Sequence, residues 1–283
     1  MPLFRTLLIL GRVSNLPTVW SNCLAGWWLG GGGNYQNLLL LLLGATSLYA
    51  GGMFLNDAFD AEFDTQYRRA RPIPSGAISA KAVWRTGLGL LGAGAICLIF
   101  LGKTTGILAV LLVLCILVYD AIHKLITVSP VLMAGCRFLL YLVAASTAAD
   151  GVTGWSVWCA FALAAYTIGL SFLARRESTR MTLQFWPCFL LAAPILLALI
   201  MNADIYLQRA LLISTVLGLW TVRCLRSTFW SASPNMMWTV SGLLAGIVWV
   251  DLLAVADCSR EFAFLLITLF LSAVLLQRVV PAT

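Results

Sequence analysis

Residues 37–57 read NLLLLLLGATSLYAGGMFLND, a mostly apolar run that ends in an amide and a carboxylate. A helix needs about 20 mostly apolar residues to cross a bilayer, and it satisfies its own backbone hydrogen bonds in lipid. This run is long enough, and its first charged residue is Asp57 at its end. The stretch therefore predicts a transmembrane helix that carries polar groups to one membrane surface.

Similar apolar runs fill almost the whole chain. They cover about residues 7–30, 37–57, 83–101, 104–122, 129–149, 154–174, 183–201, 206–224, 236–256 and 261–280. The 283 residues are 61% hydrophobic and 10% charged, whereas an ordinary soluble domain is about 25% charged. This composition excludes a soluble globular enzyme and a disordered chain. We expect an all-α, polytopic membrane bundle of nine or ten transmembrane helices, forming one domain over residues 1–283.

The basic residues divide unevenly between the two sides of these predicted spans. With the N-terminus placed inside, fourteen of the 18 Lys and Arg fall in inside loops, and only Lys103, Arg209 and Arg260 fall outside. This bias follows the positive-inside rule. We therefore expect a multi-pass protein of a bacterial cytoplasmic membrane with a cytoplasmic N-terminus. The net charge of +7 then indicates contact with membrane lipid or a phosphorylated substrate, and not with nucleic acid.

An acidic segment begins where the run at 37–57 ends. If the helix continues, Asn56, Asp60 and Asp64 lie at i, i+4 and i+8 on one face, and Asp57 flanks that face. Carboxylates at this spacing repel one another unless a cation lies between them, and Mg²⁺ prefers oxygen ligands completed by substrate phosphates. The segment therefore favours a diphosphate site over the alternative, a solvated acidic helix end, because acids at a membrane edge are usually functional.

Arginines and a turn follow the acidic segment. Arg68, Arg69 and Arg71 precede the sequence Pro-Ile-Pro-Ser-Gly at residues 72–76, which ends the helix and turns the chain. The planar guanidinium group matches phosphate oxygens. We expect a site role for Arg71, which is fixed against the turn. For Arg68 and Arg69 the alternative is simple anchoring at the inner membrane surface.

These motifs resemble a known family. Asn56-Asp57-x-x-Asp60-x-x-x-Asp64, followed by the turn after Arg71, resembles the first aspartate-rich motif of the UbiA superfamily of intramembrane prenyltransferases. Two further stretches also resemble the family. The family's next inner loop and helix are matched by Tyr119, Lys124, Pro130, Gly135 and Arg137, and its first helix is matched by residues 12–17. The resemblance covers residues 1 to about 175 well, and the rest only by hydropathy.

The resemblance implies an Mg²⁺-dependent enzyme. It would transfer a prenyl group from an isoprenoid diphosphate donor to a lipid-soluble, aromatic acceptor at the cytoplasmic membrane face. The implied metal ligands are Asp57, Asp60 and Asp64. The implied contacts to the diphosphate or the acceptor are Asn56, Arg71, Lys124, Arg137, Arg12 and Asn15. Tyr119 would shield the allylic cation with its ring face or contact the acceptor, with an interfacial tyrosine as the alternative. Apart from the resemblance, Arg137 lies inside an apolar run, where an unpaired charge is expensive, so we expect it to pair with an inner-face acid or a phosphate.

The second aspartate-rich motif of the family is altered in this chain. Two aspartates four residues apart are expected at the inner end of the sixth segment, but residues 171–177 contain a single acid, Glu177. Glu177 would then be the metal ligand there, and Arg175 and Arg176 would neutralise charge that a second metal otherwise neutralises. Asp120 lies on the same side and is a further candidate ligand, with a simple helix-end charge as its alternative.

The altered motif leaves two other functions open. An intramembrane terpene cyclase of the same fold would ionise the same diphosphate and let an internal double bond capture the cation. A non-catalytic relative would bind or carry an isoprenoid lipid without turnover. A transporter is disfavoured, because the predicted spans lack opposed charge pairs around a midplane site.

Overall fold

The computed structural model describes residues 3–179, 185–231 and 233–281, without the side chains of residues 176–179 and 204–205. This part of the chain is helical and contains no β-strand. Its helices are α1 (Leu3–Leu10), the short 3₁₀ helix η1 (Val13–Asn15), α2 (Leu16–Leu29), α3 (Tyr35–Phe59), α4 (Ala61–Tyr67), α5 (Ala80–Ile99), α6 (Lys103–Ile122), α7 (Ser129–Ser146), α8 (Gly154–Thr179), α9 (Trp186–Leu190), α10 (Ala193–Met201), α11 (Asp204–Phe229), α12 (Met236–Ala254) and α13 (Arg260–Leu276).

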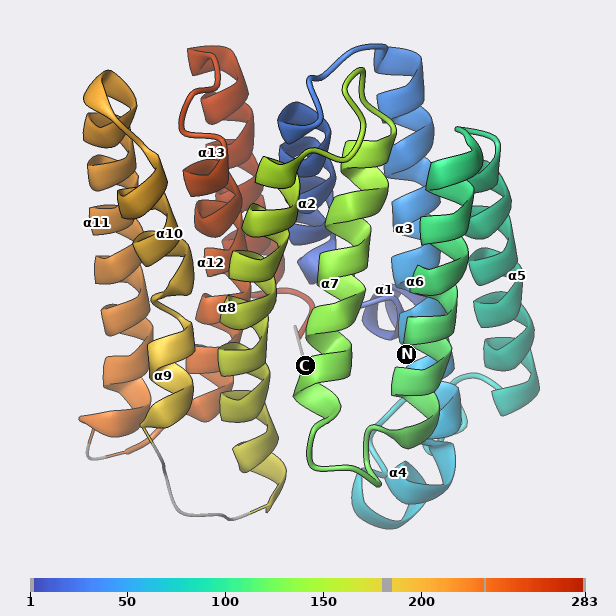
Figure 1. The fold of residues 1–283 in the computed structure, drawn as a ribbon. Coiled ribbons are helices and arrows are strands. Elements are labelled where there is room, and N and C mark those ends of the chain that lie inside the picture. The colour runs from blue at the N-terminus through green and yellow to red at the C-terminus, as the bar shows by residue number, and fades with distance from the viewer. Residues whose placement is uncertain (1–2, 180–184, 232, 282–283) are drawn as a thin grey trace.

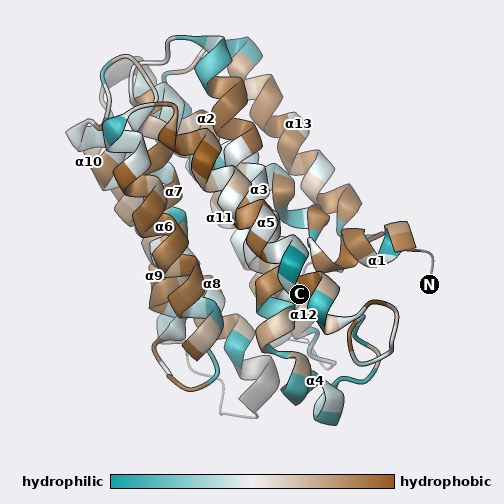
Figure 2. Cartoon of the chain, turned by 90° about the vertical axis from the view of Figure 1, so that its right-hand side faces the viewer, coloured by the Kyte–Doolittle hydropathy of each residue, from teal (hydrophilic) through white to brown (hydrophobic). Residues whose placement is uncertain are grey.

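The long helices run side by side as a bundle, with α4 at the lower end in Figure 1. Within the described residues, seven helices are long and apolar enough to cross a membrane: α3, α5, α6, α7, α8, α11 and α12. Helix α2 has 14 residues, and α13 has 17. Apolar residues dominate the middle of the helices, and hydrophilic residues gather towards their ends (Figure 2). The expected all-α membrane bundle is thus confirmed.

Two predicted segments are broken in the structure. The run at 7–30 is divided, because α1 ends at Leu10 and α2 begins only at Leu16. Helix α1 projects from the side of the bundle (Figure 2). The run at 183–201 is split between α9 and α10. Pro194 lies in the first turn of α10. A proline is tolerated at this position, but inside a continuous helix it would remove a backbone hydrogen bond and break the helix. Within the described residues, the ten apolar runs therefore correspond to seven long helices and several shorter ones.

Glycines allow α3 and α5 to approach closely. Gly44 and Gly51 on α3 face Gly87 and Gly94 on α5, and each pair is spaced by seven residues. A Cβ atom added at Gly94 would lie 2.7 Å from the carbonyl oxygen of Gly44. Membrane helices associate through small residues of this kind, because lipid offers no hydrophobic driving force between helices. This contact fixes the helix whose end carries the acidic segment.

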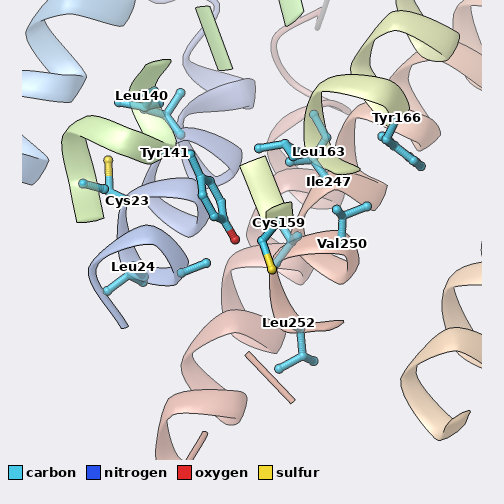
Figure 3. Close-up of a cluster of buried hydrophobic side chains, with 14 of the residues drawn as sticks. Cys23, Leu24, Leu140, Tyr141, Cys159, Leu163, Tyr166, Ile247, Val250 and Leu252 are labelled. Carbon is cyan, nitrogen blue, oxygen red and sulfur yellow. The ribbon is translucent and has the colours of Figure 1, made fainter. Parts of the chain in front are cut away.

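Helix α7 lies at the centre of the bundle, against α2, α6 and α8. The Tyr141 ring of α7 is buried between Cys23 of α2 and Cys159 of α8 (Figure 3). A Cβ atom at Gly26 of α2 would lie 2.6 Å from the Tyr141 carbonyl oxygen. Helix α2 is thus held against α7, and Arg12, which precedes α2, contacts Asn56 and Asp57 at the end of α3.

Candidate functional site

The acidic segment keeps its helical register across the junction of α3 and α4. Helix α3 ends at Phe59 and α4 begins at Ala61. The amide of Asp60 donates to the Asn56 carbonyl at 3.0 Å, and the amide of Asp64 donates to the Asp60 carbonyl at 2.8 Å. The four-residue spacing predicted from the sequence is therefore confirmed, and the side chains of these three residues share one face.

The aspartates of this segment point into the protein. The exposed fractions are 5% for Asp57, 7% for Asp60 and 1% for Asp64, whereas Glu62 is exposed. Burial of a carboxylate is costly unless a cation or hydrogen-bond donors compensate. The alternative interpretation, a solvated acidic helix end, is therefore wrong for these three aspartates.

Two arginines contact Asp57. Arg71 Nη1 lies 2.8 Å from Asp57 Oδ1, and Arg12 Nη2 lies 3.4 Å from the same oxygen. Arg12 Nη2 also donates to Asn56 Oδ1 at 3.2 Å. The structure therefore brings together four predicted site residues, and they come from three separate segments of the chain.

The backbone at Arg12 is unusual. Its φ of 41° places it in the left-handed region, and no other non-glycine residue in the described ranges has a positive φ. Such a conformation costs about 1–3 kcal/mol and persists where the surroundings impose it. Here the Arg12 carbonyl accepts from the amide of Asn15 at 2.9 Å and from the Tyr49 hydroxyl at 3.4 Å. Asn15, a predicted substrate contact, lies buried in η1 beside this turn.

Asp60 is paired with the residues that follow α6. Lys124 Nζ lies 2.7 Å and His123 Nε2 lies 3.5 Å from Asp60 Oδ1. Burial would raise the pKa of Asp60, but the hydrogen bonds and charges of His123 and Lys124 outweigh it and hold the pKa below its ordinary value. Lys124 also lies 3.9 Å from the centre of the Phe63 ring, and Tyr119 stacks on His123 at 5.1 Å.

Two buried carboxylate oxygens have no hydrogen-bond partner among the described residues, Asp64 Oδ1 and Asp120 Oδ2. Asp120 Oδ1 accepts from Asn56 Nδ2 at 3.1 Å, so this residue belongs to the same cluster. Burial raises the pKa of Asp64, and the charge of Arg71 offsets only part of this effect. A bound cation or a further hydrogen-bond donor would satisfy these two buried acceptors.

The donor set suits Mg²⁺, which prefers oxygen ligands. Within the described residues, no three His, Cys, Asp or Glu side chains form a ready metal-binding group. A metal here would therefore be completed by water and by the oxygens of a bound phosphate, which is the usual arrangement for Mg²⁺.

Arg137 does not join this cluster. Its Nη1 donates to Asn22 Oδ1 at 2.6 Å, and its Nη2 donates to Thr18 Oγ1 at 2.9 Å, both on α2. Asn22 Nδ2 in turn donates to Asp251 Oδ2 of α12 at 2.7 Å, and Ser21 Oγ donates to the same oxygen at 2.5 Å. The partner expected for Arg137 was an inner-face acid or a phosphate. The structure instead gives it a buried chain of hydrogen bonds that joins α7, α2 and α12.

Arg175, near the end of α8, contacts the connection between α6 and α7 and the first residue of α7. Its Nη1 donates to the Ile126 carbonyl and, at 2.7 Å, to Ser129 Oγ. It thereby ties the end of α8 to the connection between α6 and α7, the segment that also carries Lys124. The side chains of Arg176 and Glu177, for which site roles were predicted, lie outside those that the structure describes, so the altered second motif is located only by its backbone at the end of α8.

Two recesses lie away from the acidic cluster. A cleft of about 10 Å³ lies between α8, α10 and α12, and Trp155 and Pro194 are among its lining residues. An open apolar groove of about 410 Å³ lies between the end of α5 and the start of α6, around Gly102 and Gly106. This groove lies at the opposite end of α6 from Asp120.

Comparison with known proteins gives the same assignment as the motif. A curated relative, the digeranylgeranylglyceryl phosphate synthase of Ignicoccus hospitalis, is 39% identical over 67 residues, which are 24% of this chain and 22% of that protein. The chain thus matches about a fifth of the length of that relative.

Solved structures extend the similarity to the whole bundle. A UbiA homolog from Archaeoglobus fulgidus bound to GPP and Mg²⁺ has a TM-score of 0.70 at 16% identity, covering 93% of this chain and 99% of that one. The same homolog bound to DMAPP and Mg²⁺ has a TM-score of 0.65, with the same identity and coverage. The sequence model of the UbiA prenyltransferase family matches residues 15–280. This match agrees with the spacing of the aspartates and with their cationic partners, and it shows that the chain belongs to the UbiA prenyltransferase family.

Proposed function

We propose that this protein transfers a prenyl group from an isoprenoid diphosphate to a lipid-soluble acceptor, aromatic in character, with Mg²⁺ and at the cytoplasmic face of the membrane. One observation carries the proposal. Buried aspartates at the end of α3 and in α4 face cations from three other segments, Arg12, Arg71 and Lys124. The Archaeoglobus fulgidus homolog, bound to GPP or DMAPP with Mg²⁺, supports this class of donor.

The residues that would hold Mg²⁺ are Asp57, Asp60 and Asp64. Bound Mg²⁺ would neutralise the diphosphate and make it a better leaving group. Arg71 and Lys124 are paired with Asp57 and Asp60 in the structure. If the carboxylates held a metal, these two cations would be available for phosphate oxygens, which guanidinium and ammonium groups bind strongly. The site would thus exchange internal ion pairs for contacts with metal and substrate.

The transfer breaks the bond between C1 of the donor and its diphosphate oxygen, and the diphosphate leaves with the electron pair. Lys124, Arg71 and Arg12 stabilise the negative charge that develops on the leaving group. The ring of Tyr119, which stacks on His123, offers its face to the allylic cation. The acceptor then forms a bond to C1 and releases a proton to water.

The end of the bundle that carries the site is rich in basic residues, which supports a cytoplasmic location. The connection between α4 and α5, the start of α5, and the connection between α6 and α7 contribute Arg68, Arg69, Arg71, Lys81, Arg85 and Lys124. In contrast, the connection between α5 and α6 at the opposite end is short and precedes a single lysine, Lys103.

The test is a product assay on the purified full chain in lipid nanodiscs. Radiolabelled dimethylallyl, geranyl and longer isoprenoid diphosphates are incubated with Mg²⁺, with and without candidate aromatic acceptors. Acceptor-dependent prenylated product supports transfer. A cyclic hydrocarbon formed without acceptor indicates a terpene cyclase, and donor binding without release of diphosphate indicates a carrier. Either of the last two results rejects the proposed transfer.

A further inference from the structure

Asp120 is the buried carboxylate of this site that comes from α6. Its side chain is 3% exposed, and it lies in the last turn of the helix, three residues before His123 and four before Lys124. Oδ1 accepts a hydrogen bond from Asn56, but Oδ2 is buried without a partner among the described residues. A buried carboxylate oxygen in this state is costly, and a bound cation would offset that cost.

The hydrogen bond between Asn56 and Asp120 places the Asp120 side chain beside the acidic segment. Asn56, which holds its Oδ1 at 3.1 Å, precedes Asp57 and lies one helical turn before Asp60. On the other side of Asn56, Oδ1 of the amide accepts from Arg12 at 3.2 Å. The Asn56 side-chain amide therefore donates to Asp120 and accepts from Arg12, and these two hydrogen bonds fix its orientation. The free oxygen of Asp120 thus belongs to the same buried polar cluster as the aspartates of α3 and α4.

The charges of the cluster also call for more than one divalent cation. Four buried carboxylates, those of Asp57, Asp60, Asp64 and Asp120, lie in the cluster. The basic side chains that contact them are Arg12, Arg71, His123 and Lys124. A bound diphosphate would add more negative charge than these side chains can offset. Mg²⁺ is held by one or two carboxylates together with substrate phosphates, so two cations need carboxylates from more than one side of the site.

We propose that Asp120 is a metal-ligating residue, and that its free oxygen binds a divalent cation that also contacts the diphosphate. In this chain α6 then supplies a carboxylate of the kind that the altered motif at residues 171–177 lacks. The inference rests on the proposed function, because it concerns the same site.

Binding of Mn²⁺, a spectroscopic substitute for Mg²⁺, tests this inference without turnover. The full chain in phosphatidylcholine nanodiscs is titrated with Mn²⁺ and followed by electron paramagnetic resonance, with and without inorganic pyrophosphate. With pyrophosphate, Asp120→Asn is expected to bind Mn²⁺ about tenfold more weakly or to lose one bound ion. Glu62→Gln removes an exposed acid of the same segment and should bind Mn²⁺ as the wild type does. Equal binding by Asp120→Asn and the wild type overturns the inference.

Thermal unfolding of the same samples separates a metal ligand from a structural residue. Asn replaces the carboxylate with a group of the same shape, so the metal-free Asp120→Asn variant should have a Tm no lower than the wild type. Its Tm should then rise less on addition of Mn²⁺ with pyrophosphate. A lower metal-free Tm with an undiminished Mn²⁺ response indicates a structural role and overturns the inference.

The outcomes also separate this inference from the proposed function. If the wild type transfers prenyl groups but Asp120→Asn binds Mn²⁺ normally, the inference alone fails. If the wild type binds Mn²⁺ through Asp120 but neither transfers nor cleaves the donor, the proposed function fails and the metal-ligand assignment stands. A wild type that binds no Mn²⁺ with pyrophosphate overturns both.

Discussion

Lys124 Nζ lies 2.7 Å from Asp60 Oδ1, and this ion pair joins the segment after α6 to the junction of α3 and α4. The proposed mechanism assigns the same carboxylate to Mg²⁺. We therefore propose that Lys124 and a metal compete for Asp60, and that the ammonium group, once released from Asp60, binds a phosphate oxygen of the diphosphate.

This relationship predicts opposite effects of Lys124→Met on two ligands. Without diphosphate, Mn²⁺ should bind a few-fold more tightly, because a partly exposed ion pair of up to about 1 kcal/mol no longer competes. Pyrophosphate should bind about tenfold more weakly, since hydrogen bonds to charged groups contribute about 1.5–3 kcal/mol. Titration calorimetry measures both affinities, with Lys81→Met, which removes an exposed lysine, as the control. Weaker binding of both ligands would reject the competition.

Asp60→Asn should abolish Mg²⁺-dependent turnover. The change keeps the shape of the side chain but removes the negative charge that holds Lys124, His123 and, as proposed, the metal. The rate of diphosphate release should fall by at least about 100-fold, measured with radiolabelled donor at saturating Mg²⁺. Glu62→Gln, two residues away and exposed, should keep the wild-type rate. Unchanged turnover in Asp60→Asn would remove the acidic segment from the mechanism.

The fold and the acidic register could be predicted from the sequence because both depend on local spacing. Apolar runs of about 20 residues specify spanning helices whatever their neighbours are. Four-residue spacing places Asn56, Asp60 and Asp64 on one helical face, and the backbone hydrogen bonds between these residues confirm it. The breaks near Arg12 and Pro194 were missed, because hydropathy averages over a short interruption.

The residues that pair with the carboxylates are set by tertiary packing, so they could not be predicted from spacing along the sequence. The contact of Arg12 with Asp57 joins residues 45 apart, and that of Asn56 with Asp120 joins residues 64 apart. No site role was predicted for His123, although its position beside Lys124 was an available signal. Arg137 was expected near the acids or a phosphate, because a charge in a span needs a partner. In the structure Arg137 instead donates a hydrogen bond to Asn22 of α2.

The buried hydrogen-bond chain of Arg137, Asn22 and Asp251 should be essential to the stability of the bundle. Arg137→Met leaves Asn22 Oδ1 without its donor and removes the positive charge nearest to the fully buried Asp251 along this chain. Removal of one partner from a buried charge pair typically costs about 3–5 kcal/mol. The free energy of unfolding, measured by steric trapping in bicelles, should fall by about 3 kcal/mol in Arg137→Met and in Asp251→Leu.

The double variant Arg137→Met, Asp251→Leu distinguishes a coupled pair from two independent losses. Because each single change strands the other charge, the double variant should lose less than the sum of the single losses, by about 1 kcal/mol or more. Additive losses would show that the two residues stabilise the protein separately and that Asn22 does not connect them.

The contact between α3 and α5 provides the last prediction. Gly94→Ala places a Cβ atom 2.7 Å from the Gly44 carbonyl oxygen and 2.9 Å from the Leu48 amide nitrogen, and these backbone atoms can move only if the helices separate. Overpacking of this kind costs about 1–3 kcal/mol. Gly92→Ala, on the same helix, meets nothing within 4 Å and should be neutral or slightly stabilising, because alanine favours helix over glycine. Thermal unfolding in detergent should therefore show a lower Tm for Gly94→Ala only. An equal Tm for both variants would mean that α3 and α5 are less tightly packed in the membrane than the structure shows, and that the end of α3 is not fixed by this contact.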